Sequence, residues 1–158
     1  MGHRQPYCRR KMAAMARRAT VAKPSAKGSA PARRGLVLLA DDSVLTCELF
    51  GEYLTHQKFE VIFAHDGEAA VALALQARPD VIVMDLSMPR LGGVAAIERL
   101  KENPRTRKVP IVVLTGRVLR THEQEAHEAG ADVFLTKPCL PDEIERVIDE
   151  LLRKSKAS

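Results

Sequence analysis

Short, wholly apolar runs recur along the chain from residue 35 onward. They occupy residues 36–40, 61–64, 81–84, 111–114 and 133–135. A strand with one face in water alternates apolar and polar residues, whereas an unbroken apolar run is typical of a strand covered on both faces. The runs therefore predict five buried strands.

The segments between these runs show helical spacing of their apolar residues. Helices are expected at about residues 43–56, 67–78, from 92 onward, 121–129 and around 144–152. The first carries Leu45, Leu49 and Tyr53 on one face, and the last repeats its apolar residues with the period of an amphipathic helix. Strands that alternate with helices predict an α/β domain: a parallel sheet, helices on both faces and right-handed crossovers.

The net charge of +5 hides two regions of opposite sign. Residues 1–34 contain ten of the 25 lysines and arginines and none of the 20 acidic residues, so residues 35–158 carry 15 bases against 20 acids. Residues 1–34 are also rich in Ala, Ser, Pro and Gly, which predicts a disordered basic arm ahead of one acidic domain, residues 35–158. The arm's role stays open: a tether to nucleic acid or another anionic surface, a transit peptide, a regulatory tail, or an upstream stretch that is not translated.

Two further features narrow the class of protein. No window approaches 18 consecutive apolar residues, so we expect no membrane span. Cys8, Cys47 and Cys139 are odd in number and lack the spacing of metal ligands, which is typical of reduced thiols in a cytoplasmic protein.

Reactive side chains follow four of the five predicted strands. Asp41 and Asp42 follow the first strand, Asp85 the third, Thr115 the fourth and Lys137 the fifth. Each is ordinary when taken singly, because Asp before Ser caps helices and Thr-Gly or Lys-Pro belongs to turns. The carboxyl ends of parallel strands lie at one edge of the sheet, however, and ligands bind there. We therefore expect these five side chains to meet.

Three converging carboxylates raise one another's pKa and cost stability. A hard divalent cation relieves their repulsion, and Mg²⁺ prefers one or two carboxylates together with water and phosphate oxygens. Lys137 and Thr115 are then free to hold an anion. The set predicts a site for Mg²⁺ and a phosphoryl group.

In this order, the residues resemble the receiver domain of two-component response regulators, in the single-domain form of chemotaxis regulators. The resemblance covers residues 35–158 and rests on Asp41-Asp42, "MDLSMPRLGG" around Asp85, "LTG" with Thr115 and "GADVFLTKP" with Lys137. It implies a flavodoxin-like, doubly wound fold with five parallel strands in the order 2-1-3-4-5.

The resemblance also implies a role for each acidic residue. Asp85 accepts a phosphoryl group from the phosphohistidine of a histidine kinase or phosphotransfer protein. Asp42 and Asp85 bind Mg²⁺ directly, together with the backbone carbonyl of Ser87, while Asp41 acts mainly through water. Pro89 and the glycines after it shape a tight loop around this site.

The remaining matched positions hold the anion and pass on the signal. Lys137, followed by an often cis Lys-Pro bond, pairs with the acceptor carboxylate or the phosphoryl oxygens, and Thr115 hydrogen-bonds the phosphoryl group. Thr115 and Phe134 form a switch that alters the face made by the fourth helix, fifth strand and last helix. Gly116 leaves more room than the commoner Ala, and Ser87 and Arg117 set the lifetime of the acyl phosphate.

Other classes fit these residues less well. A haloacid-dehalogenase-type phosphatase needs a second Asp two residues after its nucleophile, and Ser87 stands there. A nucleic-acid binder has only the weak electrostatics of the arm in its favour, since Tyr7 is the one Phe, Tyr or Trp residue of the arm. A scaffold that binds a partner without phosphorylation stays open. We expect no enzyme beyond self-phosphorylation and dephosphorylation, and, because no output domain follows, an unknown downstream protein as target.

Overall fold

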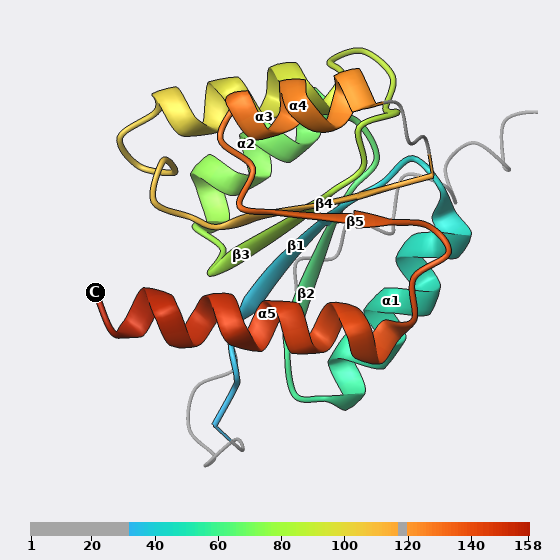
Figure 1. Ribbon diagram of the computed structural model, residues 1–158. Coiled ribbons are helices and arrows are strands. Elements are labelled where there is room, and N and C mark those ends of the chain that lie inside the picture. Colours follow the sequence, from blue (N-terminus) through green and yellow to red (C-terminus); the bar gives the residue numbers. More distant parts are fainter. Residues whose placement is uncertain (1–31, 117–119) are drawn as a thin grey trace, which may run out of the picture. The chain divides into compact units, whose positions relative to one another are not determined.

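Five parallel strands form the centre of the part of the chain that the computed structural model describes, residues 32–116 and 120–158 (Figure 1). The strands are β1 (Leu36–Ala40), β2 (Glu60–Ala64), β3 (Val81–Met84), β4 (Ile111–Thr115) and β5 (Val133–Thr136). They lie in the order β2-β1-β3-β4-β5, and every neighbouring pair is parallel. The predicted α/β class and strand order are confirmed.

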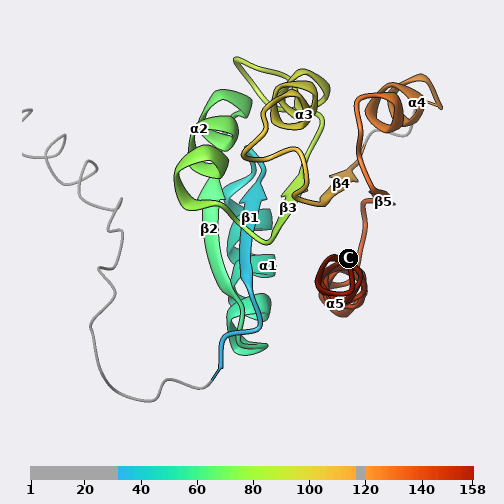
Figure 2. The same cartoon turned by 90° about the vertical axis from the view of Figure 1, so that its left-hand side faces the viewer.

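Helices cover both faces of this sheet (Figures 1 and 2). On one face lie α1 (Val44–His56) and α5 (Pro141–Lys156); on the other lie α2 (Gly67–Ala77), α3 (Gly93–Glu102) and α4 (Arg120–Glu128). The bounds of α1 to α4 differ by about one residue from the predicted ones, whereas α5 extends three residues before and four residues beyond the apolar repeat at 144–152. Within residues 32–116 and 120–158, no helix has both the length and the apolar character needed to cross a bilayer.

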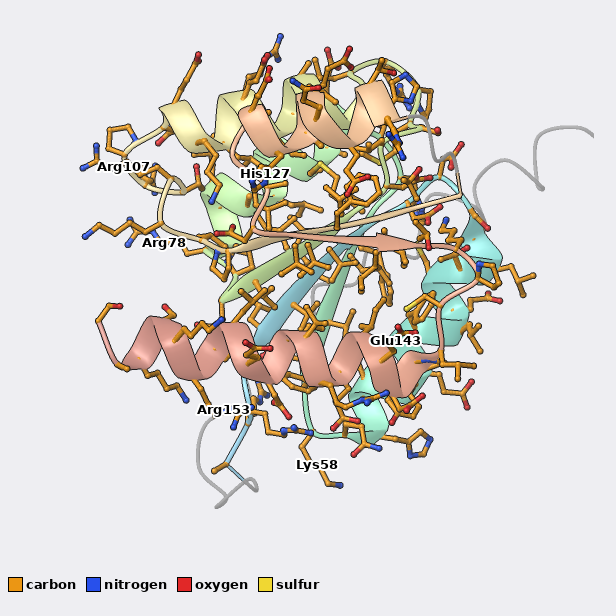
Figure 3. All side chains as sticks on the ribbon, viewed as in Figure 1. Lys58, Arg78, Arg107, His127, Glu143 and Arg153 are labelled. Atoms are coloured by element: carbon orange, nitrogen blue, oxygen red, sulfur yellow. The ribbon has the colours of Figure 1, made fainter. Side chains whose placement is uncertain are left out.

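The strands contribute side chains to two hydrophobic cores, because successive residues of a strand point to opposite faces of the sheet. Val37, Leu39, Val81, Val83, Val112 and Leu114 pack with α1 and α5. Leu38, Ala40, Ile82, Met84, Ile111 and Val113 pack with α2, α3 and α4. Figure 3 shows side chains filling the space on both faces of the sheet, while the labelled Lys58, Arg78, Arg107 and Arg153 lie at the periphery.

The apolar stripe that the sequence suggests for α1 is not the buried one. Leu45 and Leu49 are 75% and 55% exposed, whereas α1 packs through Cys47, Phe50 and Leu54. Both sets have helical spacing, so periodicity alone does not distinguish them. The choice depends on which set faces the sheet when Ser43 caps the helix, its side chain accepting a hydrogen bond from the N–H of Thr46.

The start of β1 is tied to α1 and α5 by Arg34. Its Nη1 donates to Glu145 Oε1 at 2.6 Å, and its Nη2 pairs with Asp149. The guanidinium also lies over the ring of Phe59, with Cζ 4.5 Å from the ring centroid. Tyr53 donates its hydroxyl to Glu145 Oε2 at 2.8 Å. We call Arg34, Tyr53, Glu145 and Asp149 the basal cluster.

Both carboxylates of the basal cluster are paired with the Arg34 guanidinium. The hydrogen bond from Arg34 holds the pKa of Glu145 below its usual value, and the bond to Glu145 raises the pKa of Tyr53. Arg34 was counted in the predicted arm, but its side chain contacts the folded domain. Residues 1–31 lie outside the described residues, so the disorder of the arm stays a prediction.

Candidate functional site

The carboxyl ends of β1, β3 and β5 bring four charged side chains together. Ala40 of β1 pairs with Met84 of β3, so the residues that follow, Asp41 and Asp85, leave the sheet side by side. Each of Asp41, Asp42 and Asp85 offers a carboxylate oxygen, and these oxygens lie within 4.8 Å of one another. Lys137 follows β5 and reaches the same place. We call Asp41, Asp42, Asp85 and Lys137 the acid rim.

Two of the three carboxylates are withdrawn from water. Asp41 is 1% exposed and Asp85 is 6% exposed, while Asp42 is exposed. Lys137 Nζ lies 2.6 Å from Asp41 Oδ2 and 3.8 Å from Asp85 Oδ2. The resemblance implied a pair with Asp85, but the closer contact is with Asp41, the more deeply buried carboxylate, for which an unpaired charge would cost more. Three carboxylates against one ammonium leave excess negative charge in the acid rim.

The backbone of the β1–α1 loop is held from several sides. Asp41 Oδ1 accepts the N–H of Ser43 at 2.8 Å. The carbonyl oxygen of Asp41 lies 3.1 Å from His65 Nδ1 and 3.4 Å from the thiol of Cys47. Burial raises the pKa of the Cys47 thiol to about 11, so this cysteine stays protonated at neutral pH. His65 is not among the predicted site residues, and its contact with Asp41 was not predicted.

The β3–α3 loop is as tight as its glycines suggested. Ser87 donates its backbone N–H to Asp85 Oδ1 at 3.2 Å, which orients the carboxylate. Gly93 donates to the carbonyl of Leu86 at 3.1 Å, and a Cβ at Gly93 would lie 2.5 Å from the carbonyl oxygen of Asp85. A side chain at Gly93 is therefore excluded. Gly92 has open space around it, so its own side-chain position imposes no such limit.

The other predicted site residues lie at the ends of β4 and β5. Thr115 is buried, and its carbonyl accepts the N–H of Lys137 at 2.9 Å. The Lys137-Pro138 peptide bond is cis, as the resemblance implied. A methyl group at Gly116 would meet only the Lys137 side chain, at 3.9 Å. Arg117 lies outside the described residues.

Phe134 sits on β5 beside a hollow. It is partly buried against the core shared with α2, α3 and α4. A cavity of about 550 Å³ lies between α4 and β5, and Phe134 is among its lining residues, together with Arg120 and His127. The ring therefore borders space on the face that the resemblance assigns to signal output.

The donor set of the acid rim suits a hard divalent cation. All three acidic residues offer carboxylate oxygens, which Mg²⁺ prefers, and two of them are buried with a single ammonium between them. The exposed Asp42 leaves one side of the group accessible from solvent. These residues can hold a magnesium ion and still admit an anionic ligand.

Residues 37–149 match the family model of the response regulator receiver domain. The chain belongs to this family. Among curated relatives, response regulator PleD of Caulobacter vibrioides is 37% identical over 102 residues, which is 65% of this chain and 22% of PleD. Transcriptional regulatory protein SrrA of Staphylococcus aureus is 31% identical over 122 residues, 77% of this chain and 49% of SrrA. The chain thus spans less than half the length of the curated relatives it matches.

Solved receiver domains share the fold. Chemotaxis response regulator CheY4 of Vibrio cholerae has a TM-score of 0.69 and 30% identity, covering 73% of this chain and 97% of that one. The receiver domain of sensor histidine kinase PA1611 of Pseudomonas aeruginosa has a TM-score of 0.71 and 28% identity over 75% of this chain and 98% of that one. That structure has a magnesium ion coordinated in its active-site cleft. This chain is a receiver domain of two-component signalling, and receiver domains bind Mg²⁺ at an acidic site.

Proposed function

We propose that this receiver domain accepts one phosphoryl group on Asp85, from the phosphohistidine of a histidine kinase or phosphotransfer protein in the cytoplasm. The observation that carries the proposal is the acid rim: three carboxylates with oxygens within 4.8 Å of one another, served by one ammonium at the carboxyl ends of a parallel sheet. A cluster with this excess of negative charge is costly unless a cation and a reacting group use it.

The transfer is a displacement at phosphorus. A carboxylate oxygen of Asp85 forms the new P–O bond as the P–N bond to the donor imidazole breaks, and the electron pair of the P–N bond stays on the imidazole nitrogen. The N–H of Ser87 orients Asp85, and the Lys137 ammonium, 3.8 Å from Asp85 Oδ2, is placed to offset charge on the phosphoryl oxygens. Such reactions depend mainly on alignment and charge neutralisation.

Mg²⁺ belongs to the proposal as the partner of the carboxylates. Asp42 and Asp85 would hold it directly with the carbonyl of Ser87, and Asp41 would act through water. When bound, the ion supplies positive charge opposite the transferring phosphoryl oxygens. Thr115 would donate its hydroxyl to the phosphoryl group.

Phe134 and Thr115 carry the signal onward in this proposal. The cavity between α4 and β5 gives the Phe134 ring space to change rotamer. We expect the ring to turn inward when Asp85 is phosphorylated. Fluorine NMR of labelled Phe134 should show a new resonance with a phosphoryl analogue, and an unchanged spectrum would remove Phe134 from the switch.

The exposed stripe of α1 is the surface proposed to meet the phosphodonor protein. Val44, Leu45 and Leu49 are all exposed, as is Leu140 in the segment between Lys137 and α5. The helix begins two residues after Asp42, and Leu140 follows Lys137 by three residues, so these apolar side chains flank the acid rim in sequence. An apolar helical surface on the partner would cover them and bring its phosphohistidine to Asp85.

Intact-mass spectrometry after incubation with acetyl phosphate tests the function. The chain is expected to gain one phosphoryl group with Mg²⁺, and none with a chelator or in the Asp85→Ala variant. A folded wild-type chain that gains none from this donor or from a phosphorylated histidine-containing protein would contradict the proposal and favour a phosphorylation-independent scaffold.

A further inference from the structure

We propose that His65 and Asp66 of the β2–α2 loop, together with Gly67 at the start of α2, form a brace that positions the acid rim although it supplies none of the rim's charges. The loop touches both segments that carry the carboxylates. His65 contacts the β1–α1 loop at Asp41, while Asp66 and Gly67 contact the β3–α3 loop at Arg90 and Leu91. The inference rests on the proposed Mg²⁺ and phosphoryl site, and it assigns positioning residues to that site.

The first contact fixes the backbone of Asp41. A carbonyl oxygen only accepts hydrogen bonds, so His65 Nδ1, at 3.1 Å, carries the proton and donates it. The N–H of Asp41 donates in turn to the carbonyl of Ala64 at 3.0 Å. Both backbone polar groups of Asp41 are thus tied to the end of β2 and the loop after it, with the Cys47 thiol as a second donor to the same carbonyl.

This contact bears on Asp42 as well. The carbonyl of Asp41 belongs to the peptide plane that also contains the nitrogen of Asp42, and that plane is rigid. Holding its oxygen limits the direction in which Asp42 leaves the chain. Asp42 is the exposed member of the rim, so its carboxylate has the least packing of its own to hold it in place.

The second contact is an ion pair across to the β3–α3 loop. Asp66 Oδ1 accepts the N–H of Ala69 at 2.8 Å and caps α2, while Oδ2 pairs with Arg90 Nη2 at 3.0 Å. Arg90 has φ of 65°, a left-handed conformation that is uncommon for a residue with a side chain. The carboxylate of Asp66 therefore does two tasks at once: it starts the helix and holds a strained residue of the loop.

The third contact is a close approach of backbones. A Cβ at Gly67 would lie 1.9 Å from the carbonyl oxygen of Leu91, so only glycine lets the β3–α3 loop lie against the start of α2. Arg90 and Leu91 lie between Ser87 and Gly93, the two residues that hold Asp85 and its loop. The brace therefore fastens the second carboxylate-bearing segment next to the first.

Three substitutions of His65 test the brace. The side-chain nitrogen of Asn can take the place of Nδ1, that of Gln reaches the place of Nε2, and Leu offers no donor. Isothermal titration with MgCl₂ is expected to show that His65→Asn binds Mg²⁺ within about twofold of wild type, while His65→Gln and His65→Leu bind roughly tenfold more weakly, as is typical when a group that holds a metal ligand is removed. Equal affinities in all three variants would overturn the proposal.

A readout without metal separates this proposal from the proposed function. The N–H of Ser43 donates to Asp41 Oδ1, so its hydrogen exchange reports on the order of the β1–α1 loop. Exchange is expected to speed up in His65→Leu and stay slow in His65→Asn. If wild type binds no Mg²⁺ but this exchange pattern appears, the brace stands and the proposed metal site fails. If Mg²⁺ binds and neither readout distinguishes the variants, the brace fails and the site stands.

Arg90 offers a second test with a matched control. Arg78 is also an exposed arginine with positive φ, but it lies at the other end of α2. Arg90→Gln is expected to weaken Mg²⁺ binding less than His65→Leu does, because the Arg90 side chain is 68% exposed. Arg78→Gln is expected to leave Mg²⁺ binding unchanged. Equal Mg²⁺ affinity in the two arginine variants would remove Arg90 and Asp66 from the brace.

Discussion

Strand β1 has a charged cluster at each end, and the two clusters balance their charges differently. At its start, one guanidinium is shared by two carboxylates, one of which also accepts a phenol hydroxyl. At its end, the three carboxylates of the acid rim share the ammonium of Lys137, and two of those carboxylates are buried. The basal cluster has the character of a structural ion-pair network. The acid rim instead keeps two excess negative charges, which a bound cation can neutralise.

The difference in charge balance indicates which cluster stabilises the fold and which one serves phosphoryl transfer. A carboxylate whose pKa is lowered by its partner stabilises the folded state, and Glu145 is such a group. Buried carboxylates that share too few cations oppose folding instead. We therefore expect the loss of a carboxylate charge to raise stability in the acid rim and to lower it in the basal cluster, and only the acid rim to matter for phosphoryl transfer.

Removing a positive or a negative charge from the acid rim should give the largest difference in the free energy of unfolding. Lys137→Met removes the one ammonium of the rim and is expected to lower the free energy of unfolding by about 3 kcal/mol, because it leaves buried carboxylates without a cation. Asp85→Asn removes one of the repelling charges and is expected to raise it by about 1 kcal/mol. Urea unfolding at pH 7 without Mg²⁺ measures both. Changes of the same sign would mean that the rim is not overloaded with negative charge.

Two glycine substitutions near the rim should differ sharply. Gly67→Ala drives a methyl group into the carbonyl of Leu91, so we expect a loss of about 2 kcal/mol of stability from the shifted loop. Gly116→Ala meets only the Lys137 side chain, at 3.9 Å, and should be neutral or stabilising by about 0.5 kcal/mol. Thermal unfolding of the two variants measures the contrast, and similar losses in both would contradict the loop packing described here.

The basal cluster should respond to loss of its guanidinium. Arg34→Gln is expected to cost about 1.5 kcal/mol, less than for a fully buried pair because 33% of the Arg34 side chain is exposed. Arg33→Gln is the control, since Arg33 pairs with Glu60 where both side chains are well exposed, and it should cost less than about 0.5 kcal/mol. Urea unfolding measures both variants. Equal losses in the free energy of unfolding would mean that Arg34 contributes no more than an exposed surface ion pair.

The pH dependence of the basal cluster should give the smallest effect. Because the folded-state pKa of Glu145 is lowered, its contribution is present above the unfolded pKa, near 4.5, and is lost as the pH falls through the folded pKa. Glu145→Gln is expected to be about 1 kcal/mol less stable than wild type at pH 7, and the gap should shrink below pH 4.5. The free energy of unfolding measured from pH 7 to pH 3 tests this. A difference between the variants that widens in acid would mean that folding raises the pKa of Glu145 instead of lowering it.

The sequence predicted the elements of the fold because their apolar spacing is local. The strand order came from the resemblance to receiver domains, since periodicity carries no information on which strands are neighbours. The sequence did not indicate which face of α1 is buried, because two sets of residues share the same helical spacing, and only the sheet selects Phe50 and Leu54 over Leu45 and Leu49.

The acid rim could be predicted because its residues follow buried strands, whose ends must meet at one edge of the sheet. Arg34 and His65 could not be predicted in the same way. Arg34 meets Glu145 across 111 residues, and His65 meets Asp41 across 24, so no local pattern reports either contact. Before the packing is known, Arg34 looks like one more basic residue of the arm, and His65 looks like an ordinary loop residue.

The most direct test of the account compares the two ends of β1 in one measurement. Intact masses are recorded for wild type, Asp85→Asn and Arg34→Gln after incubation with acetyl phosphate and Mg²⁺, at a temperature where all three are folded. We expect one added phosphoryl group in wild type and in Arg34→Gln, and none in Asp85→Asn. Phosphoryl gain that persists in Asp85→Asn, or disappears in folded Arg34→Gln, would contradict the division between a reactive rim and a structural basal cluster.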